Sequence, residues 1–295
     1  AMLSVQDRHL RVTDKSIVEA FIVMLLVFSF MATASEILWL RPDFPPGTFV
    51  KGPMKDQGYN DLTRQFLARR LPQYQHNVQT AGYERIIKLM QEHNVCIVGL
   101  YKSPQRQRYI LYSEPRGVVL PNGLIIRAAD REIFSPYMTE QGVDLSSLMK
   151  NPELIGGVAD GRLYKGPVDS ELAKRQKTEH LLRRSGANVF SDLLKMLDLK
   201  RIDYTFGFPV ELVYQQRLGT ISQQIAFLPI EGMPQATPSY IACSRNKWGE
   251  QVIGDINKLL RAHRLSPEYL HAYQQWLDTG SRSLHQQISE KYFAR

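Results

Sequence analysis

Short apolar runs alternate with amphipathic stretches along the chain from about residue 35 onward. Each apolar run has the length of a strand, and the expected strands cover residues 37–40, 77–79, 95–100, 124–126, 155–158, 203–206, 224–228 and 240–243. In the stretches between them apolar residues recur at helical spacing, and the expected helices cover residues 59–70, 83–93, 169–184, 190–199, 248–264 and 266–277, the last two closing the chain. This alternation is typical of βα units. The pattern therefore predicts an α/β fold.

The first 34 residues have a different pattern. Three basic residues precede an uncharged apolar run, residues 20–32, which ends in the small-x-small sequence Ala32-Thr33-Ala34. This is the layout of a secretory signal peptide, and the run is shorter than the ~20 apolar residues of a membrane-spanning helix. We expect residues 1–34 to be a signal peptide and the mature protein to be periplasmic. A buried N-terminal helix or an uncleaved anchor remains the alternative.

The chain has a formal net charge of +8, and 43% of its 295 residues are hydrophobic. Its Lys and Arg residues are scattered singly or in pairs, without a basic block or a nucleic-acid-binding motif. A solvated basic surface or an anionic small ligand fits this distribution better than nucleic acid. We found no metal-ligand spacing, nucleophile elbow or phosphate loop. The sequence therefore predicts no metal, no cofactor and no enzymatic activity.

The most specific pattern runs from Gly82 to Pro115. A helix beginning at Tyr83 leads into an apolar strand, which is followed by Lys-Ser-Pro-Gln-Arg, ending at Arg106, and then by Leu-Tyr-Ser-Glu-Pro. This segment resembles the bacterial periplasmic solute-binding family that captures polar amino acids (family 3). Members of that family have a helix, an apolar strand, Thr-Pro-Glu-Arg and Phe-Ser-Asp-Pro in this order. The resemblance covers about residues 37–277, and it indicates a divergent subgroup.

The resemblance implies a two-lobed periplasmic binding protein type 2 fold, in which each lobe is a mixed sheet flanked by helices. Lobe 1 would combine residues 35–120 with residues 230–295, and lobe 2 would be residues 121–229. A small ligand would bind in the cleft between the lobes as the hinge closes. The protein would act as a monomer, without a nucleic-acid partner, and would deliver the ligand to an inner-membrane ABC transporter or to a sensor kinase.

The resemblance also implies site residues. In the family, the Arg at the position of Arg106 binds the ligand's carboxylate, and guanidinium suits this role because its paired donors match a carboxylate and stay charged. Tyr83 and Phe44 match ligand-contacting aromatic residues, and Tyr101 stands where the family often has a Thr. The remaining candidate ligand contacts are Arg41, Phe208 and Gly161. The alternative for each is a core, rim or surface role, and Gly161 also begins a segment that we interpret as a strand-to-helix turn.

One departure from the family concerns the ligand's ammonium group. Members that bind α-amino acids place an Asp near the position of Phe208, whereas this chain is one residue shorter there and offers no acid in the local sequence. We therefore expect a carboxylate-bearing or otherwise anionic ligand, with an apolar or aromatic part, rather than a standard α-amino acid.

The chain has two cysteines, Cys96 and Cys243. In a reducing compartment they would be buried thiols, whereas an isolated pair in an exported protein suggests a disulfide. In the implied fold the strand containing Cys243 re-enters the first lobe beside the strand containing Cys96. We therefore predict that these two residues form a disulfide bond.

Two other classes of function stay open at this stage. The same fold can host an enzyme, such as a dehydratase, or a domain attached to peptidoglycan hydrolysis. Alternatively, the protein could be a sensory subunit that acts through a protein partner.

Overall fold

The computed structural model of the chain describes residues 35–294, apart from residues 161, 176–178, 186–188 and 223. The expected signal peptide and Gly161 lie outside the described residues. Among the helices that the structure describes, none is both long and apolar enough to cross a membrane.

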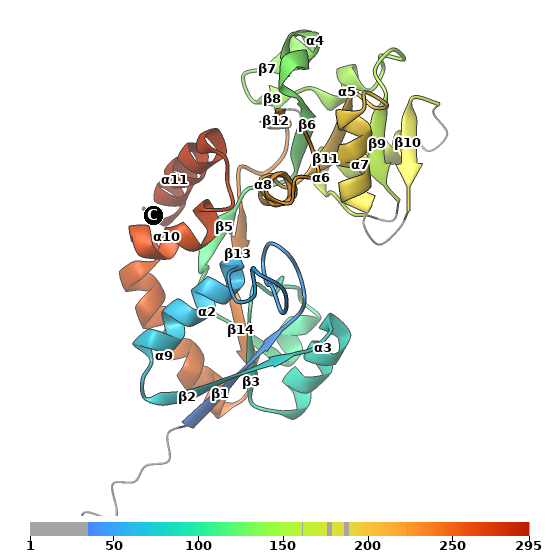
Figure 1. The fold of residues 1–295 in the computed structure, drawn as a ribbon. Helices are drawn as coiled ribbons and strands as arrows, with labels where there is room; N and C mark the ends of the chain where they lie inside the picture. Colours follow the sequence, from blue (N-terminus) through green and yellow to red (C-terminus); the bar gives the residue numbers. More distant parts are fainter. Residues whose placement is uncertain (1–34, 161, 176–178, 186–188, 223, 295) are drawn as a thin grey trace, which may run out of the picture.

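The first of two five-stranded sheets has the strand order β2-β1-β3-β14-β4 (Figure 1). Its strands are β1 (Ser35–Arg41), β2 (Tyr74–Thr80), β3 (Val95–Val98), β4 (Ile110–Tyr112) and β14 (Ile241–Ser244). β1 runs parallel to β2 and β3, whereas β14 is antiparallel to β3 and β4, so the sheet is mixed.

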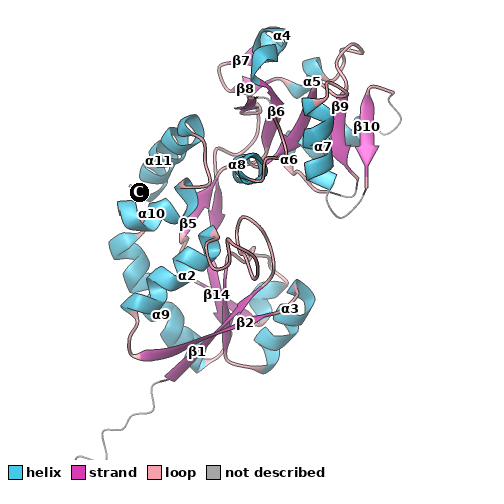
Figure 2. Ribbon diagram, viewed as in Figure 1, coloured by secondary structure: helices cyan, strands magenta, loops and turns pink. Residues whose placement is uncertain are grey.

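Side chains alternate between the two faces of this sheet, as the pleat of a strand requires. Along β1, Ile37 and Trp39 pack into the core on the side of α2 (Tyr59–Arg70) and α9 (Lys247–His263). Leu40 packs into the core on the opposite side, with residues of α3 (Tyr83–Glu92). Figure 2 shows α3 on one side of the sheet and α2 and α9 on the other. Helices therefore cover both faces of the sheet.

The second sheet has the strand order β10-β9-β11-β6-β12. Its strands are β6 (Gly123–Arg127), β9 (Gly156–Ala159), β10 (Leu181–Arg184), β11 (Tyr204–Gly207) and β12 (Ile225–Leu228). The helices of this lobe are α4 (Arg131–Phe134), α5 (Leu145–Leu148), α6 (Gly166–Lys174), α7 (Val189–Asp198) and α8 (Pro209–Arg217). Parallel pairs at β9 and antiparallel pairs at β6 make this sheet mixed too. The predicted fold class, two mixed sheets flanked by helices, is confirmed.

The chain crosses between the sheets along a short antiparallel pair, β5 (Gly117–Val119) and β13 (Thr237–Ser239) (Figure 1). β5 leads out of the first sheet and β13 leads back to it. Two further helices, α10 (Pro267–Gln274) and α11 (Thr279–Phe293), close the chain beside this pair. The smaller elements are a β7–β8 hairpin (Met138–Thr139 and Gly142–Val143) and the 3₁₀ turns η1 (Arg106–Arg108), η2 (Ala128–Asp130) and η3 (Ser135–Tyr137).

The helix expected at 169–184 is wrong, and the helices α8 and α11 were not expected. The helix expected at 169–184 ends at Lys174, and Leu181–Arg184 forms the edge strand β10 instead. α8 was missed because Pro209 occupies its first turn, where a proline is tolerated but also resembles a strand terminator. α11 was missed because its buried face is formed by Ser281, His285 and Ser289, which give no apolar periodicity.

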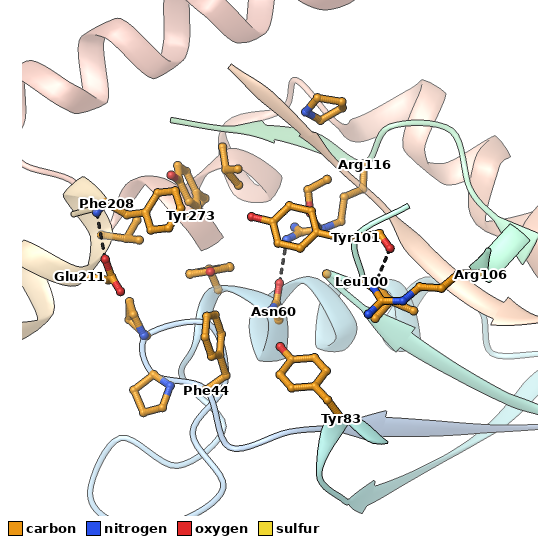
Figure 3. A pocket seen from close by; sticks show the side chains of 18 residues that line it. Phe44, Asn60, Tyr83, Leu100, Tyr101, Arg106, Arg116, Phe208, Glu211 and Tyr273 are labelled. Atoms are coloured by element: carbon orange, nitrogen blue, oxygen red, sulfur yellow. Dashed lines mark hydrogen bonds between the residues drawn. The ribbon is translucent and has the colours of Figure 1, made fainter. Parts of the chain in front are cut away.

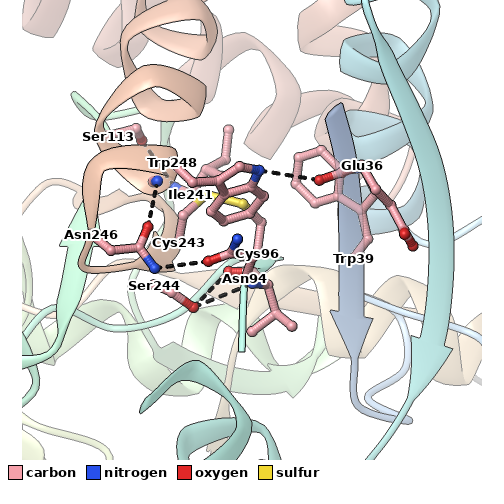
Figure 4. The surroundings of a disulfide bond; sticks show 12 residues. Glu36, Trp39, Asn94, Cys96, Ser113, Ile241, Cys243, Ser244, Asn246 and Trp248 are labelled. Atoms are coloured by element: carbon pink, nitrogen blue, oxygen red, sulfur yellow. Dashed lines mark hydrogen bonds between the residues drawn. A yellow bond between two sulfur atoms is a disulfide. The ribbon is translucent and has the colours of Figure 1, made fainter. Parts of the chain in front are cut away.

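The disulfide is formed as predicted. Cys96 on β3 and Cys243 on β14 lie directly opposite each other, and their Cα atoms are 4.1 Å apart (Figure 4). This separation is close to the spacing of a non-hydrogen-bonded pair in an antiparallel ladder. Both residues are fully buried, with Trp39 on the neighbouring strand in the same core cluster. The bond therefore joins the N-terminal and C-terminal parts of the first lobe.

His285 on α11 connects the last helix to the crossing strand β5. Its side chain is 2% exposed, Nε2 donates to the carbonyl of Val118 (3.0 Å), and Nδ1 accepts from Gln274 Nε2 (3.3 Å). Both contacts suit a neutral imidazole, and burial lowers the pKa of His285 below its usual 6.5.

The folded protein should therefore lose stability as the pH falls through about 6.5, because the unfolded chain then binds a proton that the folded chain does not. We expect a loss of about 1 kcal/mol in unfolding free energy between about pH 7.5 and pH 5.5 from this residue. Denaturant unfolding at the two pH values measures it. His285→Gln, which can still donate to Val118, should show a smaller pH dependence; an unchanged dependence would contradict the assignment.

Candidate ligand-binding site

A cavity of about 350 Å³ lies between the two lobes, beside the crossing strands. Its size falls within the range of small-molecule sites. Both lobes and the crossing strands supply its walls, as does one residue of α10. The lining residues are Phe44, Pro45, Pro46, Tyr59, Asn60, Tyr83, Gly99, Leu100, Tyr101, Arg106, Arg116, Val119, Phe208, Val210, Glu211, Pro238, Ser239 and Tyr273.

Aromatic rings form much of this lining (Figure 3). Phe44, from the loop after β1, meets Tyr83 at the start of α3 edge to face, with ring centroids 6.3 Å apart. Tyr59 and Tyr273 make a second edge-to-face pair at 5.3 Å. Phe44 remains 47% exposed and Tyr83 41% exposed, so these rings present apolar surface that a ligand can cover.

Tyr101, in the loop after β3, connects the two sides of the cleft. Nζ of Lys165, from the second lobe, lies 4.3 Å from the centroid of its ring. Burial raises the pKa of Tyr101 above its usual value, and the nearby charge of Glu211 raises it further, whereas Arg162 lowers it. Residues of the first and second lobes therefore interact directly at this ring.

Arg106 lies on η1 at the edge of the cavity. Its Nη1 donates to the carbonyl of Tyr101 at 2.9 Å (Figure 3). Within the described part of the chain, no carboxylate lies within 4.0 Å of its guanidinium. This cation therefore retains donors for an incoming acid.

Arg41 does not line the cavity. Its Nη1 donates to Asp61 at 2.9 Å and also to Asp56, so the guanidinium is paired within the protein. Of the seven predicted ligand residues, the structure brings five together around one cavity, leaves Arg41 outside it, and does not describe Gly161. The five are Phe44, Tyr83, Tyr101, Arg106 and Phe208.

The expectation that no acid is available near Phe208 is wrong, because Glu211 lines the cavity. Glu211 Oε2 accepts from the backbone N–H of Phe208 (2.9 Å), the N-cap residue of α8, and from Arg162 Nη2 (2.7 Å). An acid three residues after a helix N-cap is a capping signal visible in the sequence. The charge of Glu211 is thus already balanced by Arg162.

Sequence reasoning also missed Arg116, which directly precedes β5 and lines the cavity floor. It is 5% exposed and donates to Asn60 Oδ1 at 2.7 Å (Figure 3). No motif in the sequence distinguishes this arginine, because its position depends on how the crossing strands lie against α2.

Two mixed α/β lobes, joined by two crossing strands and enclosing a cavity, define the type 2 periplasmic binding protein fold. The chain matches no known protein family by sequence, and no curated protein matches it either.

Solved structures do share the fold. A probable amino-acid ABC transporter extracellular-binding protein from Bacillus subtilis is similar, with a TM-score of 0.60 and 15% identity over 83% of this chain and 98% of that one. A histidine kinase sensor domain with similarity to periplasmic binding proteins has a TM-score of 0.52 and 16% identity, covering 82% and 96% of the two chains. An ancestral cyclohexadienyl dehydratase has a TM-score of 0.51 and 13% identity, covering 84% and 94%.

Proposed function

We propose that the chain is a periplasmic solute-binding protein that captures a small, carboxylate-bearing ligand in the cavity between its lobes. The observation that carries the proposal is Arg106, a guanidinium at the edge of an aromatic-walled cavity with no carboxylate in ion-pair contact among the described residues. Guanidinium matches the paired oxygens of a carboxylate, and the rings suit an apolar or aromatic body on the same ligand.

The two crossing strands support a mechanism of capture by hinge closure. Between the two five-stranded sheets, β5 and β13 pair with each other, and the cavity lining is divided between the lobes. A ligand bridging both sides would favour the closed arrangement in proportion to its extra contacts there. The closed, loaded protein would then be recognised by an ABC transporter or by a sensor kinase.

Arg106→Ala is expected to weaken binding of the captured acid by about 30-fold, or about 2 kcal/mol, because it removes charge-assisted hydrogen bonds. A thermal-shift screen of anionic metabolites first identifies acids that stabilise the wild-type protein, and titration calorimetry then compares the variant. Arg108→Ala is the matched control, since Arg108 is an exposed arginine on the same 3₁₀ turn and does not line the cavity.

Two results would contradict the proposal: no acid stabilises the wild type, or Arg106→Ala binds the acid as well as the wild type does. An enzyme of the same fold is the alternative function, because one of the similar structures is an ancestral dehydratase. Against it, Glu211 is the one carboxylate in the described cavity lining, and it is engaged by Arg162 and by the start of α8. Turnover of a bound acid, followed by mass spectrometry, would favour the enzyme.

A further inference from the structure

Four residues with charged Asp, Glu, Lys or Arg side chains are buried in the part of the chain that the structure describes: Asp61, Arg116, Arg127 and Glu171. Asp61 pairs with Arg41, Arg127 pairs with Asp130 and Asp203, and Glu171 pairs with Lys174 and Arg175. Arg116 has no opposite charge within ion-pair distance among the described residues. It is the exception among these four buried residues.

The partners of Arg116 are all neutral. Nε donates to the hydroxyl of Ser239 (3.0 Å), Nη1 to the hydroxyl of Thr63 (3.2 Å) and Nη2 to the amide oxygen of Asn60 (2.7 Å). These bonds use three of the five N–H groups of the guanidinium and hold it in a fixed orientation. Ser239 and Asn60 line the cavity together with Arg116, so the fixed group borders the ligand space.

A guanidinium stays protonated in a protein, so this charge cannot be removed by a shift in protonation. Neutral hydrogen-bond partners offset only part of the free energy of taking a charge out of water, which is why buried charges are normally paired. A buried cation that faces a cavity and has no counter-charge in the protein is therefore a binding position for an anion.

The cavity as a whole has an excess of positive charge. Its charged lining residues are Arg106, Arg116 and Glu211, and Glu211 is neutralised by Arg162 behind it. Two guanidinium groups therefore remain for the ligand, those of Arg106 and Arg116, and both border the aromatic-walled cavity (Figure 3).

We infer that Arg116 binds a second acidic group, and that the ligand is a small dianion with two acidic groups on an apolar or aromatic frame. This inference rests on the proposed function, since it assigns the first acidic group to Arg106. It makes Arg116 a residue that determines ligand specificity, in addition to joining α2 to β13 by hydrogen bonds. The structural role alone would not require a charged side chain, because the three hydrogen-bond partners of Arg116 are neutral acceptors.

The test compares matched acids that differ by one carboxylate. The first pair of probes is benzoate and terephthalate, the second is 3-phenylpropanoate and 4-(2-carboxyethyl)benzoate, and the third is hexanoate and adipate. Each acid is titrated into the protein by calorimetry. For the pair of the best-fitting length, the wild type should bind the diacid at least about tenfold more tightly than the monoacid, as expected for an added charge-assisted interaction. Arg116→Gln should reduce this ratio to about one, whereas Arg116→Lys should keep part of it.

Arg108→Gln is the control for a distant charge and should leave the ratio unchanged. If monoacids bind in an Arg106-dependent manner and the wild type does not prefer any diacid, the inference is overturned while the proposed function stands. If the preference survives in Arg116→Gln, the inference is also overturned. If no acid binds the wild type, both are overturned. Should Arg116→Gln fail to fold, the wild-type ratio and Arg116→Lys still decide the question.

Discussion

Loss of the Cys96–Cys243 disulfide is expected to lower the free energy of unfolding by about 4–5 kcal/mol. The two residues are 147 positions apart, so the bond removes much of the conformational freedom of the unfolded chain. For a chain of this size the change corresponds to a fall in melting temperature of about 7–9 °C. The measurement is thermal and denaturant unfolding of the oxidised protein and of protein refolded in excess reductant.

This comparison isolates the bond, because the two samples have the same sequence. The double variant Cys96→Ala/Cys243→Ala should melt near the reduced wild type, and reductant should not change its melting temperature. Equal melting temperatures for the oxidised and reduced wild type would contradict the prediction. Reduction must be carried out on unfolded protein, since both cysteines are fully buried in the fold.

The sequence was sufficient to predict most of the elements that have an apolar face. α2 begins and ends at the predicted residues, Tyr59 and Arg70, and the buried strand around Cys96 was expected beside the strand of Cys243. Elements whose packing does not depend on apolar side chains were not predicted. β10 ends in two arginines at a sheet edge, and α11 buries serines and a histidine, so neither shows the periodicity of a buried face.

The site was only partly predictable for a different reason. The aromatic candidates were identified through the resemblance to the solute-binding family, and Phe44, Tyr83 and Tyr101 do line the cavity. Arg116 and Glu211 line it because of tertiary placement, at the crossing strands and at the start of α8. Whether an arginine is paired is also a tertiary property: Arg41 pairs with Asp56 and with Asp61, the latter twenty positions away on α2. Charge balance in the cavity therefore becomes visible only in the structure.

Asp61 organises the loop that carries one wall of the cavity. Its side chain is 1% exposed, Oδ1 accepts from Arg41, and Oδ2 accepts from the backbone N–H groups of Phe49 (2.9 Å) and Gly58 (3.3 Å). These contacts hold both ends of the segment that contains Phe44. In each of these contacts the other group is an N–H donor that needs an acceptor. A donor group at this position would therefore have nothing to bond to.

Asp61→Asn should therefore lower the free energy of unfolding by about 3 kcal/mol, because an amide NH₂ replaces one acceptor and leaves the partly buried guanidinium of Arg41 with less counter-charge. Asp56→Asn is the matched control, since Asp56 also pairs with Arg41 but its side chain is 43% exposed. The control should cost less than about 1 kcal/mol, as exposed ion pairs do. Denaturant unfolding of the two variants measures the difference.

Similar small losses in both variants would mean that Phe49, Gly58 and Arg41 are held by the rest of the loop and not by Asp61. A large loss confined to Asp61→Asn would show that one buried carboxylate fixes this wall of the cavity.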